Sequence, residues 1–168
     1  TYDAIGGTAG TPPDNYTIDH NRVRLGTGDA DFEAARTALQ KWKQVRLSWT
    51  RVWPDDTPIR EGSVIALLAR SCGLWWLNAC KIVYTVDELS PNRKFGFAYG
   101  TLPAHAGSGE ERFQLEMDDK GVVWYDILAF SRPSSVAARL AYLIFRASQR
   151  RFSVESGKEM RRIVELAQ

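Results

Sequence analysis

The chain has 168 residues, which suffices for one domain with a hydrophobic core and is short for two. Its composition, 44% hydrophobic and 25% charged, is ordinary for a soluble globular protein. The net charge of +2 does not indicate a nucleic-acid partner, and no apolar run approaches the roughly 18 residues that cross a bilayer, so we expect no nucleic-acid partner, no membrane span and a cytoplasmic location.

The first part of the chain, residues 1–20, is expected to form an irregular arm on the surface of the domain. Residues 1–15 contain Gly6, Gly7, Gly10, Pro12 and Pro13 but few apolar residues, so they offer little surface to bury. Residues 21–168 would then form a single domain.

A short strand is predicted at 22–25, followed by Gly26-Thr27-Gly28 and a helix that begins at Asp29. A strand, a Gly-x-Gly and a helix also suggest a dinucleotide site. However, the third glycine of that fingerprint falls at Asp31, and Asp29 and Asp31 would repel a pyrophosphate. We therefore interpret the glycines as a tight turn and expect no cofactor.

Six further segments have the composition of strands: 46–53, 63–70, 74–86, 94–102, 112–117 and 122–130. Short turns connect them, which favours an antiparallel meander. Asn78 shares a face of the long strand with apolar neighbours, so its amide must either bond to the backbone or fix a polar group of a ligand. Cys72 and Cys80 would be out of register in a hairpin and are expected to be free thiols.

The stretch 94–113 joins two of these strands and contains the candidate site. In its first half Phe97, Tyr99 and Thr101 share one face, while Gly96 and Gly100 leave the other face open to a close approach by a helix or a ligand. Residues 103–109 are predicted as a loop, because Pro103 cannot donate to a strand partner, and pairing is expected to resume at Arg112.

The end of the chain is predicted to be helical. Ser134 or Ser135 would cap a helix that runs through Leu140 towards Phe152, and a second helical pattern follows Gly157, so one bent helix and two helices are both compatible with the sequence. Together these elements predict an α+β helix-grip fold, in which a curved antiparallel sheet wraps around a long C-terminal helix.

One block of motifs is recognisable: Gly96-Phe97-Ala98-Tyr99-Gly100-Thr101-Leu102, His105, Glu110-Glu111, Trp124-Tyr125 and Ala129-Phe130-Ser131-Arg132-Pro133. From about His20 to the last helix, the sequence resembles family nineteen-ninety of the domains of unknown function. That family is uncharacterised, occurs in bacteria and plants, and lies in the START-like superfamily with the birch-pollen-allergen and polyketide-cyclase folds. The resemblance implies a helix-grip fold and a hydrophobic ligand, but no established activity.

A cavity between the sheet and the last helix is the natural place for a small hydrophobic ligand. Trp76 and Leu140 would add apolar wall to it. The candidate ligand-binding residues are Asn78, Phe97, Tyr99, Thr101, Trp124, Tyr125, Ser131 and Arg132.

The alternative is an enzyme of the cyclase or isomerase type, in which His105 acts as acid or base with Glu110 or Glu111 as the carboxylate. In a purely structural interpretation, one glutamate would instead bond backbone N–H groups of the loop or pair with Arg132. A metal held by His105 and the two glutamates is not expected, because adjacent side chains on a strand point in opposite directions.

Overall fold

The structure is a computed structural model that describes residues 2–89, 92–103, 105, 107–133 and 142–168. Seven antiparallel strands form one sheet in the order β1-β7-β6-β5-β4-β3-β2. The strands are β1 (Thr17–Thr27), β2 (Thr50–Trp53), β3 (Val64–Ser71), β4 (Leu74–Glu88), β5 (Arg93–Thr101), β6 (Gly107–Met117) and β7 (Val122–Pro133). Within the described residues the helices are α1 (Gly28–Gln40), α3 (Tyr142–Glu165) and the short 3₁₀ turns η1 (Gly7–Ala9) and η2 (Lys43–Val45).

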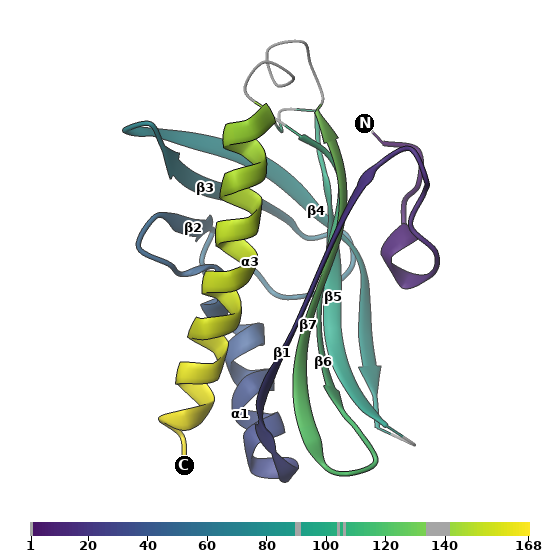
Figure 1. Ribbon diagram of the computed structural model, residues 1–168, viewed down its shortest axis with the longest axis vertical. Helices are drawn as coiled ribbons and strands as arrows, with labels where there is room; N and C mark the ends of the chain where they lie inside the picture. The colour runs from purple at the N-terminus through teal and green to yellow at the C-terminus, as the bar shows by residue number, and fades with distance from the viewer. Residues whose placement is uncertain (1, 90–91, 104, 106, 134–141) are drawn as a thin grey trace.

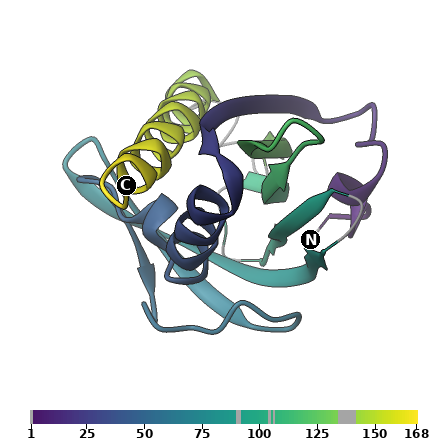
Figure 2. The same cartoon turned by 90° about the horizontal axis from the view of Figure 1, so that it is seen from below.

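The sheet is strongly curved, and α3 runs along its concave side (Figure 1). Seen from below, the sheet bends around the interior while α1 and α3 lie on the side that it leaves open (Figure 2). The main core fills this space, with Phe32 and Leu39 from α1, Phe113 and Tyr125 from the sheet and Met160 from α3. The helix-grip fold predicted from the sequence is therefore confirmed.

The junction between β1 and α1 explains the glycine at position 28. Gly28 has φ of 80°, a conformation that glycine adopts without strain. The side chain of Asp31 then accepts a hydrogen bond from the backbone N–H of Thr27, at 2.7 Å, and so satisfies a donor at the helix start. The tight turn predicted at Gly26-Thr27-Gly28 is thus wrong in its bounds, because Gly26 and Thr27 pair with Val123 and Val122 as the end of β1 and α1 begins at Gly28.

Each strand differs from its predicted bounds by at least one residue, and β1, at Thr17–Thr27, is much longer than the predicted 22–25. The segment predicted as a strand at 46–53 is paired only over β2, because residues 46–49 form a loop and a turn after η2. Pairing after β5 resumes at Gly107 and not at Arg112, so Glu110 and Glu111 lie within β6. The small residues at 107–109 can pair with β7 because backbone hydrogen bonds need an extended chain and not large side chains. At Gly109 the two strands are so close that a Cβ would lie 2.0 Å from the Phe130 carbonyl oxygen.

The C-terminal helix is continuous through Gly157, which settles the choice between one helix and two. A Cβ at this position would lie 2.8 Å from Cγ2 of Val23 on β1, so the glycine lets helix and strand approach closely. The predicted cap at Ser134 or Ser135, and Leu140, lie outside the described residues.

The N-terminal arm packs on the convex side of the sheet, opposite α3 (Figure 1). Tyr2 and Tyr16 are buried against Phe130, with ring centroids 5.9 and 5.0 Å away. The residues at 17–20, predicted to belong to the arm, are instead the first residues of β1. The division of the chain into arm and domain stays a prediction.

Candidate functional site

A cavity of about 480 Å³ lies between the concave face of the sheet and α3. Its walls come from η2, from the loop that follows η2, from strands β2 to β7, and from α3. The surface of the wall is mostly apolar, although polar side chains also contribute to it. The large apolar or aromatic lining residues include Trp49, Trp76, Tyr99, Phe130 and Phe152.

Glu111 is the acidic side chain on the inner face of this wall. On β5, its cross-strand neighbour Tyr99 donates a hydrogen bond from its hydroxyl to Oε2 of Glu111, at 2.5 Å. Burial raises the pKa of Glu111 to about 7, although the bond from Tyr99 lowers it and the charge of Asp19 adds a smaller increase. On β7 the neighbour is Ala129, a small residue that leaves space beside the carboxyl group. Glu111 can therefore act as hydrogen-bond donor or acceptor near neutral pH.

His105 lines the cavity at the end of β5. Its Nδ1 accepts a hydrogen bond from the backbone N–H of Gly107, at 2.9 Å, which assigns the ring proton to Nε2. Burial lowers the pKa of His105 to about 4, and the bond with Gly107 offsets this only in part. The imidazole is consequently neutral at physiological pH.

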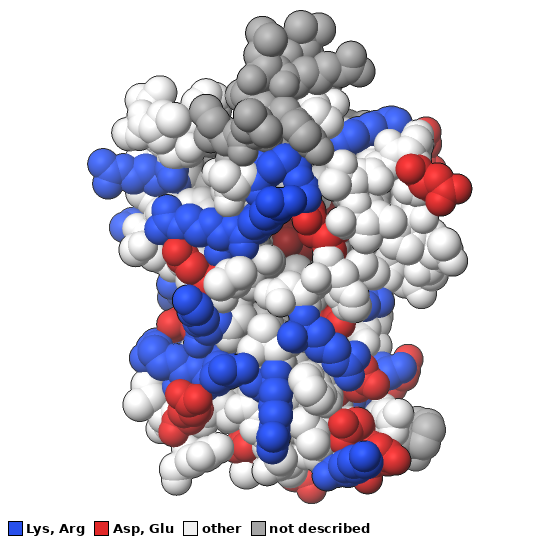
Figure 3. All heavy atoms as spheres, in the orientation of Figure 1, with Lys and Arg blue, Asp and Glu red and all other residues white. Residues whose placement is uncertain are grey.

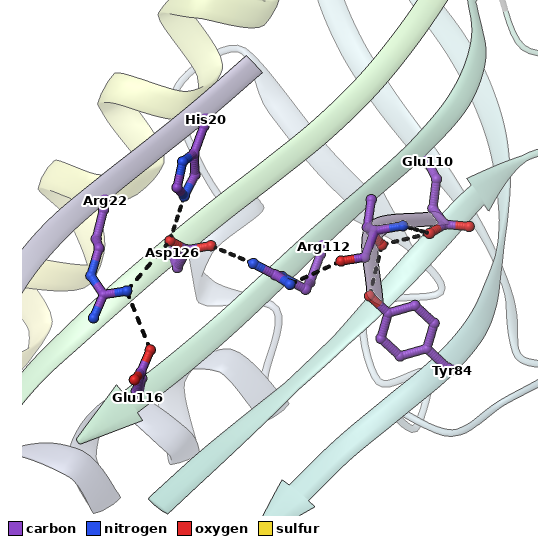
Figure 4. Close-up of polar contacts among 8 residues, drawn as sticks. His20, Arg22, Tyr84, Glu110, Arg112, Glu116 and Asp126 are labelled. Carbon is purple, nitrogen blue, oxygen red and sulfur yellow. Dashed lines mark hydrogen bonds and ion pairs between the residues drawn. The ribbon is translucent and has the colours of Figure 1, made fainter. Parts of the chain in front are cut away.

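Glu110, the residue before Glu111, is also part of the cavity wall, but its carboxylate points to the other side of the sheet and binds the N-terminal arm (Figure 4). Its Oε2 accepts hydrogen bonds from the Tyr2 hydroxyl at 2.8 Å and the Gly6 N–H at 2.7 Å. Its Oε1 accepts from the N–H of Thr8 at 2.9 Å and the hydroxyl of Thr8 at 2.5 Å. A glutamate does satisfy backbone N–H groups, as the structural interpretation expected, but they belong to the arm and not to the 103–109 loop.

The open face of β5 is also used by the arm. A Cβ at Gly100 would lie 2.0 Å from the Tyr2 hydroxyl oxygen, so the missing side chain makes room for the tyrosine that binds Glu110. The close approach predicted at this face is made by the protein itself.

A second group of polar side chains continues across the convex face (Figure 4). Buried Asp126 is 2.7 Å from Nε2 of His20 and accepts a hydrogen bond from Arg112 at 2.8 Å. Arg112 also donates to the backbone carbonyl of Thr8, at 2.9 Å. This group explains the single acidic residue in the apolar strand β7 and connects it to the arm.

Four of the eight predicted ligand-binding residues line the cavity: Asn78, Tyr99, Thr101 and Ser131. The Asn78 amide donates to two backbone carbonyls, those of Leu67 and Trp76, each at 3.4 Å. Asn78 thus combines the two interpretations that its sequence left open, since it bonds to the backbone and borders the cavity.

The other four lie elsewhere. Phe97 packs in the core against Trp42, with ring centroids 4.9 Å apart. Tyr125 is fully buried and its hydroxyl lies 3.0 Å from that of Ser156. Trp124 is on the convex side, where Arg22 lies 5.1 Å from its ring.

Arg132 lies over the ring of Tyr16, at 4.5 Å, and 3.3 Å from Asp3. Because Glu110 binds the arm and Glu111 binds Tyr99, the predicted pairing of Arg132 with either glutamate is wrong.

Several cavity residues were not identified from the sequence. Gln149 and Phe152 are three positions apart on α3, a helical spacing that could have indicated a shared face. Trp49 and Leu67 line the cavity together with Phe152 of α3, a meeting of distant segments that has no local signal.

Among the described residues, no group of three His, Cys, Asp or Glu side chains could hold a metal ion. Both cysteines are free thiols, as predicted. No helix in the described part of the chain is long and apolar enough to span a membrane.

On the face shown in Figure 3, basic and acidic side chains are interspersed around the lower half of α3. Arg151 and Arg162, for example, pair with Glu155 and Glu159.

A family model described as "Domain of unknown function (DUF1990)" matches residues 1–159. A protein of Dictyostelium discoideum named UPF0548 protein is 36% identical over 159 residues, covering 89% of this chain and 74% of the relative. A UPF0548 protein of Deinococcus radiodurans is 40% identical over 152 residues, covering 84% of this chain and 75% of the relative. Neither name assigns an activity.

Solved structures are similar in fold at low sequence identity. The Zhui aromatase/cyclase from Streptomyces sp. R1128 has a TM-score of 0.58 at 15% identity, covering 90% of this chain and 94% of the other. Ara h 8.0201 has a TM-score of 0.54 at 12% identity, covering 89% and 98%. At such identities the likeness shows the shared helix-grip fold alone.

Proposed function

The chain belongs to the DUF1990 family of unknown function, and we propose from its cavity that it binds a small, mostly apolar molecule that carries one hydrogen-bonding group. The observation that carries the proposal is the cavity itself. Its volume of about 480 Å³ falls within the usual range for small-molecule sites, roughly 300–1,000 Å³. Its wall is mostly apolar, with a few converging polar groups, as such sites require.

The polar groups suggest what kind of ligand fits. Glu111 with its pKa near 7 and neutral His105 leave the cavity with little fixed charge. An anionic ligand would lose its hydration without gaining an opposite charge, whereas a carbonyl group could accept a hydrogen bond from protonated Glu111 and a hydroxyl group could donate one to its ionised form. Of neutral and anionic ligands, a neutral one therefore fits best.

The acid–base alternative has less support. Among the described residues, neither Glu110 nor Glu111 forms an ion pair with His105, and Glu110 already accepts four hydrogen bonds from the arm. A His–carboxylate pair of the kind that enzymes use for proton transfer is thus not assembled from these residues. We favour binding over catalysis.

The experiment is a titration with N-phenyl-1-naphthylamine, a neutral fluorophore that brightens in apolar surroundings. Ala129→Leu places additional carbon atoms in the cavity beside Glu111, and we expect it to weaken probe binding by about tenfold or more. The matched control is Ala147→Leu, at an exposed position of α3, which should bind as the wild type does. Equal binding by the wild type and Ala129→Leu would refute the proposal.

A further inference from the structure

The first four residues of β4, directly after the turn from β3, have apolar side chains that are exposed to solvent. Leu74, Trp75, Trp76 and Leu77 are 62%, 46%, 51% and 56% exposed. Successive residues of a strand point to opposite faces, so this tip is apolar on both sides. A tip of this kind has no buried face of its own, and apolar surface exposed in a cluster usually marks an interaction site.

The charged side chains of the hairpin itself near the tip are all basic. The sequence contains no Asp or Glu from residue 62 to residue 86, whereas it contains Arg70 and Lys81. Arg70 is exposed and is the cross-strand neighbour of Trp75. Arg51, on β2, holds its guanidinium 5.5 Å from the ring of Trp75. On the face seen in Figure 3, basic side chains lie beside the hairpin end, which itself appears white.

The tip is also continuous with the cavity wall. Trp76, Cys72 and Ser71 of the hairpin line the cavity together with Asn78, so the exposed turn stands at the edge of the candidate site. Trp75 and Leu77 point to the opposite face of the hairpin.

We propose that the β3–β4 tip docks on the surface of an anionic lipid bilayer, with Leu74, Trp75, Trp76 and Leu77 at the level of the head groups. Tryptophan is favoured in this layer because its ring is apolar while its indole N–H can remain hydrated. Basic side chains next to an apolar segment add attraction to anionic lipids. A projecting hairpin with apolar residues on both faces suits insertion into a soft layer better than a flat protein surface.

Docking in this manner would place the edge of the cavity at the membrane surface. An apolar ligand could then pass between bilayer and cavity with little exposure to water. Passage of a ligand between bilayer and cavity rests on the proposed function, whereas docking itself requires only the hairpin.

The test is flotation of the full chain with vesicles of phosphatidylcholine, alone or mixed with phosphatidylserine. We expect the wild type to float with the mixed vesicles, and less at high salt. The double variant Trp75→Ser/Leu77→Ser changes the side of the tip that faces away from the cavity, and should lower vesicle partitioning by about tenfold or more. Trp53→Ser, which removes an exposed tryptophan from β2, is the matched control and should float as the wild type does.

Three results would overturn the proposal: no flotation of the wild type, equal flotation of the double variant, or a wild-type dimer that the double variant converts to a monomer. The last result would make the tip a contact between two copies of the chain. A measurement without variants is quenching of tryptophan emission by brominated phosphatidylcholine in the mixed vesicles, and its absence would also count against docking. Ala129→Leu keeps the hairpin, so flotation of that variant separates a failure of docking from a failure of cavity binding.

Discussion

The carboxyl group of Glu111 should make the stability of the protein depend on pH in a way that a single substitution removes. Its pKa is 4.5 when the side chain is in water and about 7 in the folded protein. Between these values the folded state keeps a proton that the unfolded state has lost. The stabilisation associated with that proton is therefore fully present below pH 4.5 and is lost as the pH rises through 7.

The size of the effect follows from the separation of the two pKa values. Each pKa unit corresponds to about 1.4 kcal/mol, so the full difference is about 3–4 kcal/mol. The side chain borders a cavity that can admit water, which relieves part of the cost of ionisation, so we expect a measured effect of about 1–3 kcal/mol.

Glu111→Gln has no carboxyl group to ionise, and its amide oxygen can still accept the bond from Tyr99. Measured by urea unfolding between about pH 5 and about pH 8, the stability of this variant relative to the wild type should rise by that 1–3 kcal/mol. Glu61→Gln, an exposed position, corrects for the change in net charge. A constant difference across this pH range would show that Glu111 is ionised and hydrated throughout, and the neutral cavity would then be refuted.

Two further changes test the convex face and the packing of α3. Glu110→Ala should lower the free energy of unfolding by about 2–4 kcal/mol, because the arm loses the acceptor of four hydrogen bonds. Hydrogen exchange at the Gly6 and Thr8 amides should become faster, and unchanged exchange would contradict the anchoring role of Glu110. Gly157→Ala should lower the free energy of unfolding by about 1–2 kcal/mol, because the new methyl group meets Val23. In a Val23→Ala background this loss of stability should vanish. An equal loss in both backgrounds would mean that the close contact is not its origin.

The overall fold could be predicted because its signals are local. Alternating apolar residues indicated the strands, short turns indicated their antiparallel order, and the helical spacing near Phe152 and Met160 indicated the final helix. The small residues from 107 to 109 carry no alternation, so the start of β6 was placed too late.

The site was harder to predict because it depends on contacts between distant segments. Alternation along β6 correctly separates Glu110 from Glu111, but nothing near Glu110 in the sequence indicates that residues 2–8 supply its partners. Likewise, Phe97 and Tyr125 have the aromatic character of cavity residues, yet the curvature of the sheet places them in the filled core. Sequence patterns identify which face a side chain is on, but not whether that face is filled or hollow.

The neighbouring glutamates of β6 have a practical consequence for anyone who wishes to alter ligand preference. One of them holds the first residues of the chain in place and the other borders the hollow interior, although a single peptide bond separates them. A library that randomises both codons would mix folding defects with changes in selectivity. Mutagenesis aimed at new ligands should therefore vary residue 111 and leave residue 110 as it is.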